Sequence, residues 1–211
     1  MRSARQIDPD LFEWDAWRPT EAARLLGDVE APWYVAAGWA IDLFLGEERR
    51  EHEDLEIAAP SKRFAEVADA LREFETYVIE PGCATPLADA SAELLEETHQ
   101  TWVLDRAAEV WRLDVFREPS DGDTWVCRRD ESIRLPYDRV FDRTNDGIPY
   151  GRPEIILLFK AKHARPKDDE DFAAVLPLLG PAQRRWLAEA LELVHPGHRW
   201  LPDLSEAGHP A

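Results

Sequence analysis

The sequence lacks several features that would assign it at once to a class of protein. None of its 211 residues belongs to an apolar run near the ~20 residues that a membrane-spanning helix requires. Its two cysteines, Cys83 and Cys127, have neither disulfide-framework nor metal-site spacing. Acidic residues occupy the N-terminal region where a signal peptide needs an apolar segment. We therefore expect a soluble, cytoplasmic protein that does not bind membranes.

Basic residues are also scarce. Lys and Arg total 25 against 43 Asp and Glu, which gives a net charge of −18. Such a charge argues against a nucleic-acid backbone or an anionic membrane as the main partner. It suits a cationic small molecule, which an acidic cleft would concentrate, although it also agrees with plain solubility.

Residues 33–58 are the most informative stretch. Trp33–Ala37 form an apolar, β-prone run, and Gly38 follows it. Apolar residues then recur at helical spacing until Gly46, a residue that commonly ends a helix. A glycine between a strand and a helix lets the backbone approach a phosphate closely, and the helix N-terminus favours anions.

Two acidic side chains are expected to share one face of the next strand. Within residues 53–58, Leu55 and Ile57 alternate with Asp54 and Glu56. Side chains two apart on a strand point the same way, so the two carboxylates lie together and repel each other. Hard oxygen ligands at this spacing suit Mg²⁺. A phosphate cradle followed by a metal-binding pair indicates nucleotide chemistry.

This stretch resembles the signature of the DNA polymerase β-like nucleotidyltransferase superfamily, in particular its aminoglycoside and lincosamide nucleotidyltransferase branch. The matching residues are Gly38-Trp39-Ala40-Ile41-Asp42, Gly46 and Arg50-x-His52-x-Asp54-Leu55-Glu56. Two positions depart from the pattern: Ala37 replaces the first glycine of a Gly-Gly pair, and Glu56 replaces the Asp usual in the antibiotic-modifying members. The resemblance implies that Gly38, Trp39, Arg50 and His52 shape a nucleotide or phosphate site.

The resemblance and the residue pattern together predict an α/β (α+β) fold. We expect residues 1–150 to form a nucleotidyltransferase catalytic domain, in which helices flank a mixed sheet. Residues 151–211 are expected to form a C-terminal helical part with a flexible tail from His195. Residues 9–26 are expected to form an opening amphipathic helical region, and residues 83–98 show no clear period.

A third carboxylate is needed to complete the predicted metal and catalytic cluster of Asp54 and Glu56. Asp114 is the best candidate, because it faces opposite to its apolar neighbours Leu113 and Val115 and, in the alternation, to Trp111. Its role would be metal ligand, general base toward the acceptor hydroxyl, or both. Asp105 is the reserve candidate on the preceding strand.

Lysines cluster late in the chain, at Lys160, Lys162 and Lys167, although the chain has only four. Lys160 continues an apolar helix, so its ammonium could reach a triphosphate or simply extend to water. We expect Lys160 and Lys162 to assist nucleotide binding.

The sequence therefore predicts a Mg²⁺-dependent enzyme, with a two-metal site, that moves a nucleoside monophosphate from a nucleoside triphosphate such as ATP to a small-molecule hydroxyl. An aminoglycoside-like acceptor is the first expectation, by resemblance. Two alternatives stay open. The acceptor could be a protein, as in toxin–antitoxin nucleotidyltransferases, or the chain could be a degenerate module that binds nucleotide or a partner without catalysis. The donor base, the acceptor and the oligomeric state are left open.

Overall fold

The computed structural model describes residues 5–206, whose contacts group them into two units. The first comprises residues 5–35 and 50–120, and the second comprises residues 36–49 and 121–206. The predicted mixed α/β fold with a helical C-terminal part is confirmed. The domain boundary at residue 150 stays a prediction.

A mixed sheet forms the framework of the first unit, with its strands in the order β2-β3-β7-β6-β4-β5. Its strands are β1 (Glu13–Trp14), β2 (Tyr34–Val35), β3 (Glu56–Pro60), β4 (Glu75–Glu80), β5 (Cys83–Pro86), β6 (Gln100–Asp105) and β7 (Val110–Glu118). β3 and β7 run parallel, the short β1 adds to β7 in parallel, and the other pairs in this order are antiparallel. Because β3 and β7 are parallel, the residues that enter them lie at the same end of the sheet.

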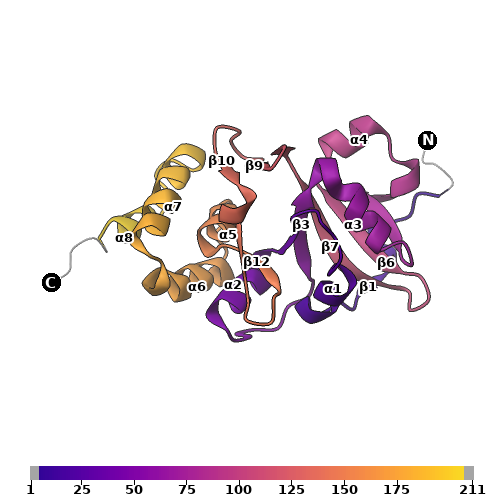
Figure 1. The fold of residues 1–211 in the computed structure, drawn as a ribbon, viewed down its shortest axis with the longest axis horizontal. Coiled ribbons are helices and arrows are strands. Elements are labelled where there is room, and N and C mark those ends of the chain that lie inside the picture. Colours follow the sequence, from indigo (N-terminus) through magenta and orange to yellow (C-terminus); the bar gives the residue numbers. More distant parts are fainter. Residues whose placement is uncertain (1–4, 207–211) are drawn as a thin grey trace. The chain divides into compact units, whose positions relative to one another are not determined.

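Short helices accompany this sheet. They are η1 (Pro9–Leu11), α1 (Pro19–Leu25), η2 (Ser61–Arg63), α3 (Phe64–Ala70), η3 (Leu87–Asp89) and α4 (Ala92–Glu97). α3 contacts β3 (Figure 1), and its Phe64 and Val67, three residues apart, are buried as their spacing predicts. Residues 83–98, which have no clear period, form β5, η3 and α4.

The amphipathic helical region expected over residues 9–26 is interrupted by a strand. η1 comes first, Trp14 then pairs with Trp111 in the sheet, and α1 begins only at Pro19. Proline suits the first position of a helix, where its missing N–H costs nothing. The ring of Trp14 packs edge-on against Trp102, with centroids 5.0 Å apart. Tertiary packing of Trp14 therefore outweighs the helical spacing.

β7 contains a β-bulge that simple alternation does not reveal. The pairing of β6 with β7 shifts register, and Arg112 is the extra residue. The bulge turns Trp111 to the face that carries Asp114, where its ring lies edge-on to Trp102 at 5.4 Å. The expectation that Trp111 shares a face with the apolar residues after it is wrong, because the bulge reverses the alternation.

Helices dominate the second unit (Figure 1). They are α2 (Ala37–Leu45), η4 (Tyr137–Arg139), α5 (Pro153–Lys160), α6 (Pro166–Val175), η5 (Leu176–Leu178), α7 (Pro181–Val194) and α8 (Leu201–Glu206). The strands that follow β7 in the chain are β8 (Ser120–Asp121), β9 (Thr124–Val126), β10 (Arg134–Pro136), β11 (Phe141–Arg143) and β12 (Pro149–Gly151). β9 pairs with β10 and β11 with β12, both antiparallel. α5 has four consecutive buried apolar residues and contacts α2, α6 and α7, so it is the central helix of this unit.

The C-terminal segment is folded as far as residue 206, instead of forming a loose tail from His195. Trp200 is 3% exposed, and its ring stacks on Phe172 of α6 with centroids 4.5 Å apart. Its indole Nε1 also donates to Asp169 Oδ1 at 2.8 Å. One buried aromatic thus anchors a Pro- and Gly-rich segment. The last part of the expected tail, residues 207–211, lies outside the described residues.

Candidate functional site: carboxylates beside two parallel strands

Asp54 and Glu56 lie where the chain enters β3. Leu55 and Ile57 are fully buried, whereas Asp54 and Glu56 are partly exposed, so the predicted alternation is confirmed. The strand itself begins at Glu56, and residues 53–55 lead into it.

Asp114 is brought beside this pair by strand register. Glu56 and Asp114 are direct Cα partners across the parallel strands β3 and β7, and the Asp114 N–H donates to the Leu55 carbonyl at 2.9 Å. Directly paired residues project to the same face, so Glu56 and Asp114 point the same way. Asp114 is only 3% exposed, and its Oδ2 accepts a hydrogen bond from Gln100 Nε2 at 2.7 Å. Gln100 is a positioning partner that the sequence did not single out.

The reserve candidate, Asp105, has a local structural role. Its Oδ1 accepts from the backbone N–H groups of Ala107 and Ala108, both at 3.1 Å, and its Oδ2 accepts from Arg112 at 3.3 Å. The backbone hydrogen bond from Ala108 and the guanidinium of Arg112 lower the pKa of Asp105. Asp105 therefore caps the turn between β6 and β7.

The chemistry of Asp54, Glu56 and Asp114 fits a hard cation. All three offer carboxylate oxygens, the donors that Mg²⁺ prefers. Within residues 5–206, no three or more His, Cys, Asp or Glu side chains are arranged as a complete metal-binding group. Ligation of Mg²⁺ by these three residues therefore stays a prediction.

Arg50 and His52 lie in the loop before the carboxylates and contact each other. Arg50 Nη1 is 3.1 Å from His52 Nδ1, and both side chains are partly exposed. A short loop thus orders a guanidinium and an imidazole within four residues of Asp54. Their binding to phosphate stays a prediction.

The glycine region begins α2 in the second unit. Gly38 is buried and Trp39 is partly exposed in the first turn. Ala37 has a φ of +48°, in the left-handed region that favours glycine, and Gly46 ends the helix with a φ of +77°. The backbone at Ala37 thus keeps a conformation suited to the missing glycine. Asp42 stabilises the loop after α2, because its Oδ2 accepts from the Arg49 N–H at 3.3 Å.

Lys160 ends α5 inside an ion cluster of the second unit. Its ammonium lies 2.9 Å from Asp171 Oδ2 and 3.1 Å from Asp168 Oδ1. Arg165 Nε reaches Asp168 Oδ2 at 2.9 Å, and Arg49 Nη1 lies 3.6 Å from Asp171 Oδ1. The side chains of Lys160, Asp168 and Asp171 are 7%, 0% and 4% exposed. Lys160 thus neutralises two buried carboxylates, and its contact with a triphosphate stays a prediction.

Burial would by itself raise the pKa of Asp168. The hydrogen bond from Arg165 and the charge of Lys160 outweigh burial and lower this pKa to about 2. Asp168 therefore stays ionised at neutral pH.

Lys162, two residues beyond Lys160, differs from the buried Lys160 because its side chain is exposed.

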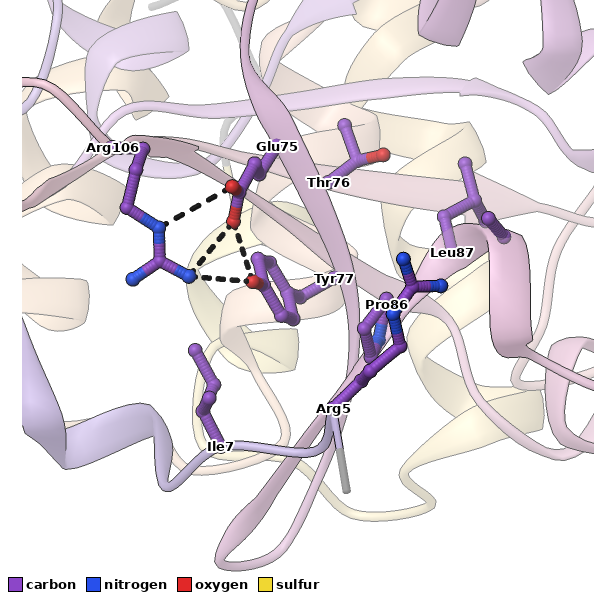
Figure 2. A pocket seen from close by; sticks show the side chains of 9 residues that line it. Arg5, Ile7, Glu75, Thr76, Tyr77, Pro86, Leu87 and Arg106 are labelled. Atoms are coloured by element: carbon purple, nitrogen blue, oxygen red, sulfur yellow. Dashed lines mark hydrogen bonds and ion pairs between the residues drawn. The ribbon is translucent and has the colours of Figure 1, made fainter. Parts of the chain in front are cut away.

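A separate hollow of about 490 Å³ lies at the β4–β5 side of the first unit (Figure 2). Arg106 Nη2 donates to Glu75 at 3.0 Å and to the Tyr77 hydroxyl at 3.2 Å, and that hydroxyl donates to Glu75 at 2.6 Å. Burial and the Glu75 hydrogen bond raise the pKa of Tyr77 to about 12. β6 separates β4 from β7, and the predicted site residues are not among those that line this hollow.

Comparisons of the sequence and the structure with known proteins identify the fold. Residues 20–84, which include Asp54 and Glu56, match the family model of aminoglycoside-2''-adenylyltransferases. The crystal structure of ANT(2'')-Ia in complex with adenylyl-2''-tobramycin is similar with a TM-score of 0.54 at 15% identity, covering 82% of this chain and 95% of that one. The chain has the nucleotidyltransferase fold.

Two further structures share this nucleotidyltransferase fold. The solution structure of ANT(2'')-Ia gives a TM-score of 0.53 at 14% identity, over 82% of this chain and 89% of that one. The lincomycin-bound lincosamide antibiotic adenylyltransferase LnuA gives 0.50 at 17% identity, over 74% of this chain and 92% of that one. No curated protein sequence gives a significant match.

The predicted resemblance to the aminoglycoside and lincosamide nucleotidyltransferases is confirmed. Nucleotidyl transfer, the predicted enzyme class, is the class of the matching family and of these structures. Through residues 5–206 of this nucleotidyltransferase fold, no helix combines the length and apolarity that crossing a membrane requires.

Proposed function

We propose that this protein is a Mg²⁺-dependent nucleotidyltransferase that modifies a hydroxyl of a small, cationic, aminoglycoside-like molecule. The observation that carries the proposal is the register of Glu56 with Asp114, which places a buried carboxylate beside the pair that enters β3. The family match and the net charge of −18 support a cationic acceptor.

The reaction forms a bond between the acceptor oxygen and the α-phosphorus of a nucleoside triphosphate, and breaks the bond to pyrophosphate. Asp54, Glu56 and Asp114 would hold Mg²⁺, which when bound neutralises phosphate charge. The Asp114 carboxylate would accept the proton of the acceptor hydroxyl, and the Gln100 hydrogen bond would keep it oriented.

The nucleotide would be bound by Gly38 and Trp39 of α2, by Arg50 and His52, and by Lys162. In this proposal Lys160 acts indirectly, because its ammonium already binds Asp168 and Asp171. The left-handed backbone at Ala37 supports a retained phosphate-binding turn rather than a degenerate one, because alanine has kept the conformation that glycine would adopt.

Calorimetric titration with ATP, GTP, CTP and UTP, with and without Mg²⁺, tests the proposal. We expect one nucleotide to bind in a Mg²⁺-dependent manner, and Asp54→Asn to abolish that dependence. Glu53→Gln is the matched control, because Glu53 is exposed in the same segment and its loss should leave binding unchanged.

A positive titration names the donor for an acceptor screen in which released pyrophosphate is measured. If nucleotide binding is the same with and without Mg²⁺ and is unchanged in Asp54→Asn, the assignment of Asp54 as a Mg²⁺ ligand is excluded. Labelled protein bands in place of a labelled small molecule would instead identify a protein acceptor.

A further inference from the structure

A group of basic side chains gathers around Phe159 in the second unit. The guanidinium carbon of Arg128 lies 4.8 Å from the Phe159 ring centroid, and that of Arg129 lies 5.5 Å from it. Guanidinium groups stack on aromatic faces, and their N–H groups lie in the guanidinium plane and can bind an anion. The Phe159 ring therefore holds two arginines from the segment after β9 against α5.

Two nitrogen atoms in this region are buried without a hydrogen bond. Arg129 Nε and His195 Nε2 have no hydrogen-bond partner within the part of the chain that the structure describes. Each such buried polar atom destabilises the protein unless something binds it.

The charged side chains that act on His195 have the same sign. Burial lowers the pKa of Arg129 and the charge of Arg128 lowers it further, against a smaller opposing effect of Cys127. Burial also lowers the pKa of His195, as do the charges of Arg129, His198 and Lys162. The His195 imidazole is thus affected by Arg129 from the segment after β9, by Lys162 from the turn after α5, and by His198 from its own segment. These cations lie in a chain whose net charge is −18.

We propose that Arg128, Arg129, Lys162 and His195 form a binding site for a phosphate-bearing anion. A multiply charged oxyanion supplies acceptor oxygens for Arg129 Nε and His195 Nε2, the two buried nitrogen atoms, and negative charge beside the cationic side chains. Arg128 and Arg129 bind phosphate oxygens, Lys162 contributes an exposed ammonium, and the His195 imidazole donates from Nε2.

The site extends the proposed function without depending on it. The anion is an oligophosphate, either the phosphate chain of a nucleotide or free pyrophosphate, the product of the proposed transfer. Lys162 was expected from the sequence to contact phosphate, and the structure adds Arg128, Arg129 and His195.

Titration of the full chain with inorganic pyrophosphate, in the presence of EDTA, tests the site apart from metal and transfer. We expect binding by the wild-type protein and a loss of affinity of about tenfold or more in Arg129→Gln, because a hydrogen bond to a charged group contributes about 1.5–3 kcal/mol. Arg139→Gln removes the same charge from an exposed position in the same unit, and we expect at most about a twofold change. Equal losses in the two variants, or no binding by the wild type, would overturn the proposal.

A second readout uses the unmodified protein. Pyrophosphate bound next to His195 should raise its pKa, which NMR titration of the imidazole signals measures. An unchanged His195 signal at saturation would exclude the site even if Arg129→Gln failed to fold. Parallel titrations with ATP and AMP separate the sources: stronger binding of ATP than of pyrophosphate identifies a nucleotide, and the reverse identifies free pyrophosphate. If pyrophosphate binds this site while no transfer is found, only the proposed function fails.

Discussion

The two units use buried carboxylates in opposite ways. In the second unit, Asp168 and Asp171 are neutralised by Lys160, with Arg165 and Arg49 at the ends of the cluster. In the first unit, strand register aligns Glu56 with Asp114, and the amide of Gln100 orients Asp114. Carboxylates held by internal cations stabilise a fold, whereas carboxylates aligned on one sheet face are suited to an external cation. The same residue type therefore has a structural role in one unit and a proposed chemical role in the other.

The largest expected effect tests the chemical side of this comparison. Asp114→Asn should retain nucleotide binding but lower kcat by between about a hundredfold and ten-thousandfold, because the amide cannot accept the acceptor's proton. Asp105→Asn, on the neighbouring strand, is the control and should leave kcat nearly unchanged. Steady-state kinetics and a thermal melt of both variants make the measurement. If Asp114→Asn instead melts at a lower temperature and keeps a normal kcat, Asp114 has a structural role. The two units would then not differ in how they use buried carboxylates.

The structural side is tested by removing the buried cation. Lys160→Met should lower the free energy of unfolding by about 3–5 kcal/mol, because Asp168 and Asp171 would lose their shared cation. Lys162→Met is the matched control, since its exposed ammonium should contribute at most about 1 kcal/mol. Chemical denaturation of both variants gives the two values. If Lys160→Met and Lys162→Met are equally stable and only Lys160→Met binds nucleotide more weakly, Lys160 binds phosphate after all.

A smaller effect should appear in the acid stability of the second unit. The pKa of Asp168 is lowered to about 2 from an ordinary 3.8. A lowered pKa stabilises the fold fully above the unfolded value, so about 2 kcal/mol should be lost as the pH falls from about 4 toward about 2. The stability difference between wild type and Asp168→Asn should shrink by this amount over that range. The exposed Asp203→Asn is the control, and a constant difference for Asp168 would contradict its ion pairing.

The smallest expected effect concerns backbone strain at Ala37, which affects the stability of the second unit independently of its ion pairs. Ala37→Gly should stabilise the protein by up to about 1 kcal/mol, because it relieves the strain of an alanine at φ +48°. Ala40→Gly, in the interior of the same helix, should destabilise it by about 1 kcal/mol. Denaturation curves for both variants make the comparison, and a destabilised Ala37→Gly would show that no strain is stored there.

The sequence predicted the parts of the site that depend on local pattern. The alternation of Leu55 and Ile57 with Asp54 and Glu56 is a property of neighbouring residues, and so is the end of α2 at Gly46. The partner of Glu56 depends on the register between β3 and β7, and 49 residues lie between the two strands. Asp114 could be predicted from its alternation with apolar neighbours, whereas its hydrogen bond to Gln100 could not.

Other misses have the same physical origin. Asp168 lies in the first turn of α6, where a negative charge is favourable. Its ion pair with Lys160 depends on how the chain turns between α5 and α6, a turn that no spacing rule gives. Likewise, the bulge at Arg112 changes the face of Trp111 without changing the composition of the strand.

The division of the chain into interleaved segments has a consequence for how it can be dissected. Residues 36–49 lie in sequence between two strands of the first unit, yet α2 contacts α5 and α6 in the second. No single cut in the chain therefore separates the two units, because a cut at residue 35 or 49 divides the first unit and a cut at residue 120 divides the second. Shuffling of gene segments could exchange the C-terminal helices only together with residues 36–49, so the two units should be inherited as one module.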